Sequence, residues 1–368
     1  MTEFVLALNA GSSSVKHALF DIGGDGAPAE RARGETMAED GASLPLSLTA
    51  LAHHLETEHG RIVAIGHRIV HGGGQFSGPV RLDDTVVEAL DALTPLAPLH
   101  QPRCLTLVRA SRSLWPDRPH VGCFDTAFHN CLSPPVSRYA LPRAYEAQGV
   151  RRYGFHGLSY DHVARHLAKI SPALLAKRTV VAHLGNGASL CAMRNGASVD
   201  TTMGFSVLDG LVMGTRCGEI DPGILLWLQR SQGLDVHQLE HLLYHQSGLL
   251  GVSEISSDMR VLLASKDPRA TEAVALFIHG VARGIATMAH TLGGLENLVF
   301  TGGIGQHAPE IRALVCERLA WLGVTIDGDA NAQGATVIGS EASHVEVRVI
   351  ATNEESTIAR GVRAVVRG

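Results

Sequence analysis

The sequence predicts a mixed α/β fold built as two domains of similar topology. Strands alternate with helices along most of the chain, and each half opens with a strand hairpin closed by glycine, serine or asparagine. At about 150 residues per domain, the length of 368 residues predicts two domains. With 45% hydrophobic and 18% charged residues, the chain can bury a full core. We therefore expect a sheet with covering helices in each half.

The first half begins with two apolar runs that are typical of strands, at residues 4–9 and 15–20. The turn Ala10-Gly11-Ser12-Ser13-Ser14 joins them into a hairpin. Residues 23–43 are polar and rich in turn formers, so we expect a loop there. The remaining elements expected in this half are strands at 61–71 and 120–124, and helices at 84–93 and 102–114.

The second half repeats this beginning. We expect strands at residues 178–184, 188–194, 197–201, 298–301 and 345–351, and helices at 309–322 and 354–366. When the two hairpin sequences are aligned without gaps, Val5-Leu6-Ala7 matches Val180-Val181-Ala182, and Ser14-Val15 matches Ser189-Leu190. A chance match of two glycine-rich hairpins is the alternative to this weak internal repeat, which predicts two domains of like topology.

Charge, cysteines and hydropathy exclude several classes of protein. The net charge of −5 provides no general attraction for nucleic acid or an anionic membrane. The six cysteines form no C-x-x-C pair and no zinc-like spacing, which indicates reduced thiols. The N-terminus has no basic segment typical of a signal peptide. Residues 273–292 are apolar but contain Arg283, so we expect a buried core helix rather than a membrane span, in a soluble cytoplasmic protein.

Three glycine-rich turns follow predicted strands, at residues 9–14, 185–187 and 302–305. None matches a Walker A loop or G-x-G-x-x-G. A single such turn is most often only a turn. Their backbone amides can nevertheless cradle phosphate oxygens, and their recurrence in both halves favours a nucleotide held in a cleft between the domains.

Charged residues flank these turns. Arg68, His156 and Arg216 lie among glycines, where a guanidinium or imidazole is well placed to meet an anion; surface salt bridges are the alternative. Asp125 and Glu354 follow predicted strands, where carboxylates of α/β folds face the ligand crevice. Glu354 also suits the first turn of a helix.

Three further histidines, His237, His241 and His245, recur every four residues on one helix face. No acidic partner accompanies them, so a solvated face is favoured over a metal site.

Taken together, these segments resemble the acetate kinase family. The matching stretches run in the family's order over essentially the whole chain: Leu8-Asn9-Ala10-Gly11-Ser12-Ser13-Ser14-Val15-Lys16, His67-Arg68-Ile69-Val70-His71-Gly72-Gly73, Phe124-Asp125-Thr126-Ala127-Phe128-His129, Arg152-Tyr153-Gly154-Phe155-His156-Gly157, His183-Leu184-Gly185-Asn186-Gly187, Gly214-Thr215-Arg216-Cys217-Gly218 with Asp221-Pro222-Gly223, Phe300-Thr301-Gly302-Gly303-Ile304-Gly305, and Thr352-Asn353-Glu354-Glu355.

The resemblance implies the duplicated fold shared by actin and the sugar kinases, with an interdomain nucleotide cleft. Residues 1–128 and 355–368 would form the N-terminal, carboxylate-side domain, and residues 129–354 the C-terminal, nucleotide-binding domain. The implied activity is reversible, direct phosphoryl transfer between ATP and acetate, giving acetyl phosphate and ADP, with Mg²⁺ or Mn²⁺, in a homodimer.

The resemblance also implies a role for each matching position. Those implied for catalysis are Asp125, His156 and Arg216. The carboxylate and its methyl group would contact Arg68, Val70, Leu99, Phe155 and Val207. Asn9 and Glu354 match the metal-site residues. The residues that match nucleotide-contacting positions of the family are Lys16, His183, Leu184, Gly185, Asn186, Gly187, Asp258, Met259, Arg260, Gly303, Ile304, Gly305, Gln306 and His307.

The sequence departs from the family pattern at a few positions. Val207 replaces a common proline, Gln306 and His307 replace Glu-Asn, and Gln101-Pro102-Arg103 replaces a smaller segment. The chain is also shorter than typical members. A propionate or butyrate kinase of the same chemistry is one alternative. A non-catalytic, actin-like ATP-binding switch is another, and the presence of Arg68 and Arg216 disfavours it.

Overall fold

The computed structural model describes residues 3–11, 14–24, 26–37 and 44–368, which fold into two compact units. Unit 1 comprises Met1–Asn130, His156–His162 and Asn353–Gly368. Unit 2 comprises Cys131–Phe155 and Val163–Thr352. His156–His162 falls within the predicted second domain (129–354), whereas the structure groups it with unit 1.

Hydrogen bonds explain that grouping. The Gly157 amide donates to the Asp125 carbonyl at 2.9 Å, and Thr357 Oγ1 donates to the Leu158 carbonyl at 3.1 Å. Both bonds tie the segment to other parts of unit 1.

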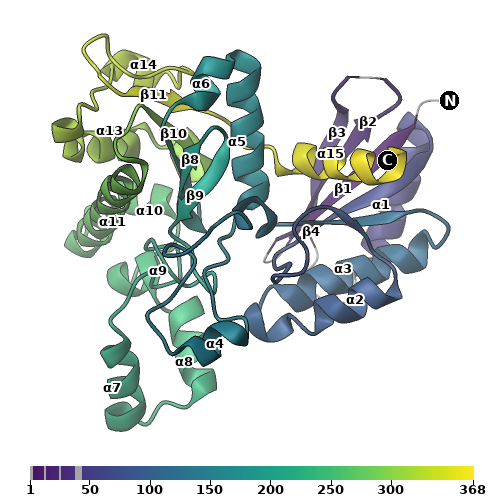
Figure 1. Ribbon diagram of the computed structural model, residues 1–368, viewed down its shortest axis with the longest axis horizontal. Coiled ribbons are helices and arrows are strands. Elements are labelled where there is room, and N and C mark those ends of the chain that lie inside the picture. The colour runs from purple at the N-terminus through teal and green to yellow at the C-terminus, as the bar shows by residue number, and fades with distance from the viewer. Residues whose placement is uncertain (1–2, 12–13, 25, 38–43) are drawn as a thin grey trace. The chain divides into compact units, whose positions relative to one another are not determined.

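The sheet of unit 1 has the strand order β3-β2-β1-β4-β6-β5 (Figure 1). Its strands are β1 (Phe4–Ala10), β2 (Ser14–Asp21), β3 (Ala29–Met37), β4 (Ile62–Ile69), β5 (Val80–Arg81) and β6 (His120–Phe124). β1, β4 and β6 are parallel neighbours, while β1, β2 and β3 pair antiparallel. The predicted hairpin and the two later strands are confirmed; Ser12 and Ser13 of its turn lie outside the described residues.

The prediction of a loop over residues 23–43 is wrong, because β3 forms within it. Residues 25 and 38–43 of that range lie outside the described part of the chain. β3 is an edge strand that carries mostly charged and small residues and is held by backbone pairing with β2. An edge strand with solvent-facing side chains needs no apolar alternation, which is the signal on which strand prediction depends.

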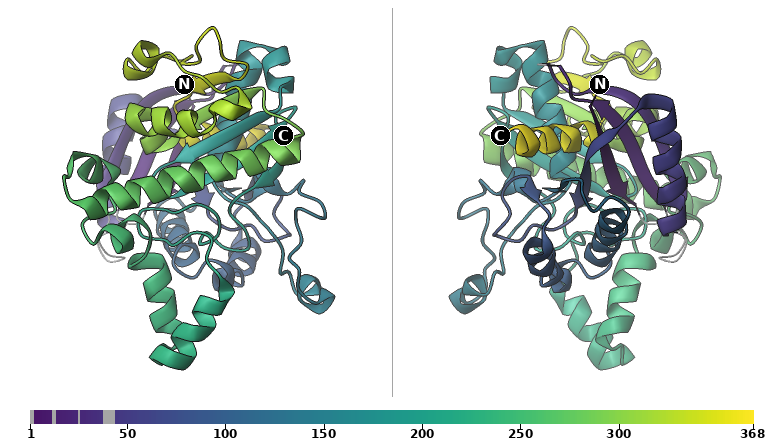
Figure 2. Two further views of the ribbon diagram at one scale, coloured as in Figure 1. Left: turned by 90° about the vertical axis from the view of Figure 1, so that its left-hand side faces the viewer. Right: turned by 90° about the vertical axis from the view of Figure 1, so that its right-hand side faces the viewer.

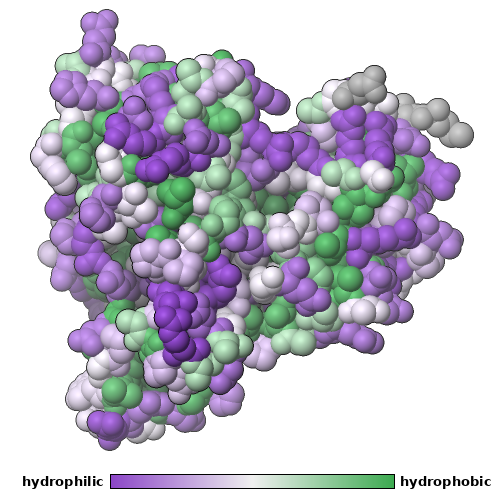
Figure 3. Space-filling view, in the orientation of Figure 1, coloured by the Kyte–Doolittle hydropathy of each residue, from purple (hydrophilic) through white to green (hydrophobic). Residues whose placement is uncertain are grey.

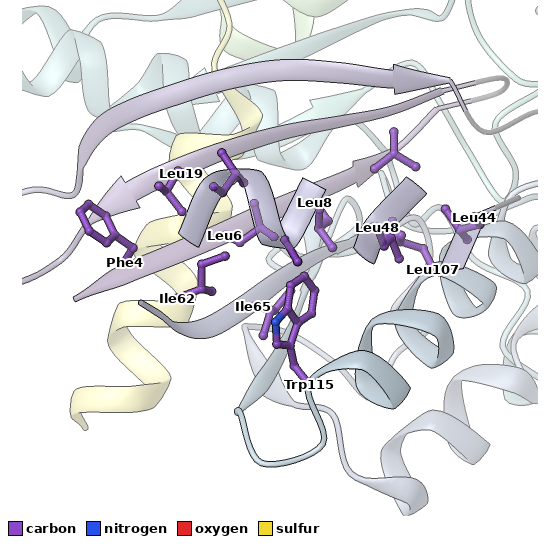
Figure 4. Packing of buried hydrophobic residues seen from close by; sticks show 13 residues of the cluster. Phe4, Leu6, Leu8, Leu19, Leu44, Leu48, Ile62, Ile65, Leu107 and Trp115 are labelled. Atoms are coloured by element: carbon purple, nitrogen blue, oxygen red, sulfur yellow. The ribbon is translucent and has the colours of Figure 1, made fainter. Parts of the chain in front are cut away.

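Helices cover both faces of this sheet. They are α1 (Leu44–His59), α2 (Asp84–Asp91), α3 (Gln101–Leu114) and α15 (Glu354–Arg367), with 3₁₀ turns at Thr94–Leu96 and Ala127–His129. Residues 44–59 carry no predicted element; the helices at 84–93, 102–114 and 354–366 are confirmed to within a few residues. On β1, the side chains of Phe4, Leu6 and Leu8 pack with α1 and α3 (Figure 4). Val5 and Ala7 point to the other face, against α15.

The sheet of unit 2 repeats this topology. Its strands are β7 (Thr179–Leu184), β8 (Ala188–Arg194), β9 (Ala197–Thr201), β10 (Asn297–Thr301) and β11 (Glu346–Val349), in the order β11-β10-β7-β8-β9. Reading outward from β7, the antiparallel strands β8 and β9 lie on one side and the parallel strands β10 and β11 on the other. β1 has the same neighbours in unit 1, so the predicted duplication is confirmed.

Helices make up most of the rest of unit 2. They are α4 (Arg143–Ala147), α6 (Pro172–Ala176), α7 (Pro222–Gln232), α8 (Val236–His245), α9 (Gly248–Ser253), α10 (Met259–Ala264), α11 (Pro268–Leu292), α12 (Gly302–His307), α13 (Pro309–Arg318) and α14 (Gly328–Ala332), with a 3₁₀ turn at Ala320–Leu322. α5 (Gly157–Ile170) begins in unit 1 and continues into unit 2. The glycine turn expected at 302–305 is instead the start of α12, and the helix expected at 309–322 ends at Arg318.

The long helix α11 is sufficiently long and apolar to cross a membrane by length and composition alone, and no other helix of the described residues meets that test. Half of its most apolar stretch of 18 residues is buried, and the helix packs along β7, β8 and β9 (Figure 2). A core helix of a globular protein has these properties. Over the face shown in Figure 3, hydrophilic and hydrophobic side chains are interspersed.

Candidate active site

Three of the predicted site residues of unit 1 lie at one edge of its sheet. Asn9 is next to the last residue of β1, Arg68 is next to the last residue of β4, and Asp125 directly follows β6. β1, β4 and β6 are parallel neighbours, so their carboxyl ends meet at the same edge. This edge is where open α/β sheets bind ligands.

Arg68 and Asp125 form a buried ion pair. Nε of Arg68 donates to both carboxylate oxygens of Asp125, at 3.1 and 3.0 Å, and Nη2 donates to Oδ2 at 2.6 Å. Asp125 is 1% exposed. Burial disfavours the charged guanidinium, but the attraction and hydrogen bonds of Asp125 outweigh it and raise the pKa of Arg68. The guanidinium is therefore a fixed positive charge at the sheet edge.

The amide of Asn9 connects this pair to the start of α15. Its Nδ2 donates to Glu354 Oε2 and to Glu355 Oε1, both at 3.0 Å, and its Oδ1 lies 3.5 Å from Nη1 of Arg68. Nη1 also donates to the Ala10 carbonyl at 3.2 Å. Of the two glutamates, the sequence pattern favours Glu354 as the functional acid, but the carboxylates of both Glu354 and Glu355 accept a hydrogen bond from Asn9.

These groups fit a divalent cation that is shared with a nucleotide. Carboxylate and amide oxygens are the ligands that Mg²⁺ prefers, and it commonly takes only one or two protein carboxylates besides substrate phosphates and water. Within the described residues, no group of three or more His, Cys, Asp or Glu side chains could hold a metal ion by itself. Asn9 and Glu354 are the residues at this edge that could hold such an ion, through an amide oxygen and a carboxylate oxygen.

His156 occupies a strained position at the start of α5. Its φ is +58°, a left-handed conformation that is uncommon for a residue other than glycine. The next residue, Gly157, approaches the Asp125 carbonyl so closely that a Cβ would lie 2.2 Å from that oxygen. This close approach holds the backbone of His156 next to the segment that carries Asp125.

Unit 2 contains a cavity of about 760 Å³ that collects three of the predicted nucleotide segments. Eight of its lining residues were predicted from the sequence to contact the nucleotide: Gly185, Asn186, Asp258, Met259, Arg260, Gly303, Ile304 and His307, the last of which ends α12. The wall also contains residues that sequence reasoning missed: Ser257, Leu263, Ala264, Ala308 and Glu310. Their positions directly beside the predicted segments were the available signal.

The ends of β7 and β10 are packed closely beside this cavity. Gly302 has a φ of +77°, and a Cβ there would lie 2.6 Å from the Leu184 carbonyl oxygen. A Cβ on Gly185 would lie 3.8 Å from the Gly303 nitrogen. Thr301 Oγ1 is buried and has no hydrogen-bond partner among the described residues. Bare backbone and an unpartnered hydroxyl beside a cavity fit a site for a phosphorylated ligand.

Other predicted nucleotide residues do not line the cavity. Leu184 is fully buried within β7, and His183, Gly187 and Gly305 are not part of the cavity wall. With its amide oriented to satisfy both atoms, the Gln306 oxygen accepts from the backbone N–H groups of Gly302 and Thr352 at 3.3 Å. This residue therefore connects the start of α12 to Thr352.

Lys16 belongs to unit 1. It is exposed on β2, directly opposite Asn9 in the β1–β2 pairing.

Arg216 lies in the irregular segment that follows β9. Its Nη1 donates to the carbonyl oxygen of Val207 at 2.9 Å, so these two predicted site residues are in contact. Phe155 and Val207 are buried in unit 2, whereas Val70 is buried and Leu99 half-buried in unit 1.

The histidine face of residues 237–245 is confirmed as helical, on α8. The rings of His241 and His245 lie 5.2 Å apart. No metal-binding group of three was found there or elsewhere in the described residues.

Comparison with known proteins decides the family. The model of the acetokinase family matches residues 27–360. This chain belongs to the acetokinase family. It is 48% identical to an acetate kinase of Rhodopseudomonas palustris, over 98% of each chain. It also resembles the crystal structure of a propionate kinase from Francisella tularensis, with a TM-score of 0.89, 37% identity, and 99% and 100% of the two chains covered.

A second solved relative supports the fold. The crystal structure of Porphyromonas gingivalis acetate kinase matches with a TM-score of 0.86 and 33% identity, over 99% of this chain and 100% of that one. The predicted duplicated α/β fold is thus confirmed as the acetokinase fold. As an acetokinase, the chain is a phosphotransferase with a carboxyl group as acceptor, and ATP or ADP and a small carboxylate are its substrates.

Proposed function

We propose that this chain transfers the γ-phosphoryl group of ATP reversibly to acetate, forming acetyl phosphate and ADP with Mg²⁺ or Mn²⁺. The observation that supports this most directly is the gathering of Asn9, Arg68, Asp125 and Glu354 at one sheet edge. That edge combines a fixed cation for a carboxylate with oxygen ligands for a metal.

The carboxylate is already a nucleophile, so the reaction needs no general base. Its difficulty is the approach of two anions and the charge that develops on the moving phosphoryl group. We assign Arg68 to the acyl carboxylate, with Asp125 fixing the plane of its guanidinium. Arg216 and His156 donate hydrogen bonds to the phosphoryl oxygens in the transition state.

Asn9 and Glu354 hold the metal in this proposal. When bound, Mg²⁺ or Mn²⁺ neutralises charge on the nucleotide phosphates. Transfer is direct and in line between nucleotide and carboxylate, without a phosphorylated enzyme residue.

The remaining residues bind the two substrates. The walls assigned to the acyl methyl group are Val70, Leu99, Phe155 and Val207. The cavity of unit 2 is assigned to the nucleotide, with the segments at 183–187, 258–260 and 303–307, and Lys16 contributes from unit 1. Residues 1–128 and 355–368 then serve the carboxylate and residues 129–354 the nucleotide. We further propose a cytoplasmic homodimer that binds neither nucleic acid nor membrane.

A hydroxamate assay tests the proposal. The purified protein is incubated with ATP, Mg²⁺ and each carboxylate from formate to butyrate, and the acyl phosphate is trapped with hydroxylamine. Acetate should give the highest kcat/KM, and omission of Mg²⁺ should abolish turnover. ATP binding without acyl phosphate from any carboxylate would instead support a nucleotide-dependent switch.

Propionate kinase activity is the second candidate. The likeness to the Francisella tularensis propionate kinase favours it, as does Val207, which lacks the backbone constraint of the proline common in the family. In the same assay, a higher kcat/KM with propionate than with acetate would establish this alternative.

A further inference from the structure

Glu355 is a buried carboxylate that the proposed chemistry leaves without a role. It is 4% exposed, at the second position of α15, and one of its oxygens, Oε1, accepts the hydrogen bond from Asn9. A carboxylate so fully removed from water is stable in its charged form only when cations or donors surround it. The charge and orientation of the Glu355 carboxylate therefore also depend on the group that contacts its other oxygen, Oε2.

That group is Arg33 of β3. Nη1 of Arg33 donates to Glu355 Oε2 at 3.1 Å. The other edge of the same guanidinium donates from Nε and Nη2 to the two oxygens of Glu30, both at 2.8 Å. Arg33 thus bridges two carboxylates with one planar fork, a geometry that lysine cannot reproduce.

The bridge extends to the start of α15. Asn353 Nδ2 donates to Glu30 Oε2 at 3.0 Å, while Asn353 Oδ1 accepts from the Ser356 amide at 2.8 Å and caps the helix. One continuous network therefore connects β3 with the turn that carries Glu354 and Glu355.

The orientation of Asn9 follows from this network. Its NH₂ group faces the two glutamates, which turns Oδ1 toward Arg68 and the sheet edge. If Glu355 turned away, the amide of Asn9 would lose one of the two acceptors that define its direction. Partners that orient metal-site residues commonly change metal affinity by about 10–100-fold when they are removed.

We infer that Arg33 and Glu355 form a positioning pair that fixes Asn9 for the metal–nucleotide complex. The inference rests on the proposed metal-dependent kinase function and adds to it two residues that touch neither substrate. β3 thereby has a role in the reaction, although it is an edge strand.

A matched pair of variants tests this. Arg33→Ala removes the bridge. Arg31→Ala removes a neighbouring arginine of the same strand, which forms an ion pair with Asp21 at 2.8 Å, the same distance as the pair of Arg33 with Glu30. Arg33→Ala should raise the KM for Mg²⁺ about tenfold, with a much smaller change in the KM for acetate. Arg33→Lys keeps the charge and should raise the KM for Mg²⁺ less than Arg33→Ala does. Arg31→Ala should change neither KM.

Metal binding is also measured without turnover. The melting temperature is recorded with ADP at increasing Mg²⁺, and with ADP plus a chelator. In Arg33→Ala the half-saturating Mg²⁺ concentration should rise about tenfold, whereas the melting temperature in chelator measures separately the stability that is lost with the Arg33–Glu355 ion pair. If the unaltered protein makes no acyl phosphate but shows this metal-dependent shift, the proposed function fails while the positioning pair stands. Equal half-saturating Mg²⁺ for Arg33→Ala, Arg31→Ala and the unaltered protein would overturn the inference.

Discussion

Replacing Arg68 by leucine should affect both stability and carboxylate binding, because this side chain belongs to a buried ion pair. Asp125, at 1% exposed, would lose the guanidinium that donates to it at 2.6, 3.0 and 3.1 Å. Removing one partner of a buried pair typically costs about 3–5 kcal/mol. Since the Arg68 side chain is 18% exposed, we expect the lower end, about 3 kcal/mol.

Calorimetry and urea unfolding measure this loss. At about 2–4 °C per kcal/mol for a unit of 150 to 250 residues, the melting temperature should fall by about 6–12 °C. The double variant Arg68→Leu/Asp125→Leu removes both charges and should regain part of the stability. Arg109→Leu, which breaks an exposed ion pair with Asp91, is the control and should cost less than about 1 kcal/mol.

Kinetics separate binding from stability. In Arg68→Leu the KM for acetate should rise strongly while the KM for ATP changes far less, and the double variant should not recover acetate binding. A stability loss no larger than that of Arg109→Leu would refute the buried pair. Equal increases in both KM values would refute the assignment of Arg68 to the carboxylate.

Three further predictions concern catalysis, specificity and pH. Arg216→Ala should lower kcat by about 10³, or about 4 kcal/mol, with little change in nucleotide affinity; near-normal turnover of the folded variant would exclude Arg216 from the mechanism. Val70→Ala should raise kcat/KM for propionate relative to acetate, within the about 10–200-fold that one methylene provides, and an unchanged ratio would remove Val70 from the pocket. Burial lowers the pKa of His120 to about 4, so the unfolded state takes up protons first as the pH falls. The contribution of His120 to the free energy of unfolding should therefore be fully present above about pH 6.5 and be lost as the pH falls toward 4. In urea unfolding, the free energy of unfolding of His120→Gln should fall less steeply over this range than that of the unaltered protein.

Much of the fold could be predicted because local signals were strong. The strands at 120–124, 188–194 and 197–201 form with the predicted bounds, since apolar runs between turn formers are typical of strands. The loop predicted across β3 failed because polar edge strands lack that signal. Predicted site residues such as Asn9, Arg68 and Asp125 came together because each lies at the end of a parallel strand.

The sequence alone determined which side chains carry charge and where the glycine turns interrupt the strands, because both are properties of the local chain. Only the tertiary structure decided which charges meet. Arg68 pairs with Asp125 because β4 and β6 are neighbours, and Arg33 reaches Glu355 because β3 and the start of α15 come together across more than three hundred residues. Such pairings arise from sheet order and helix packing, which no local pattern of residues encodes.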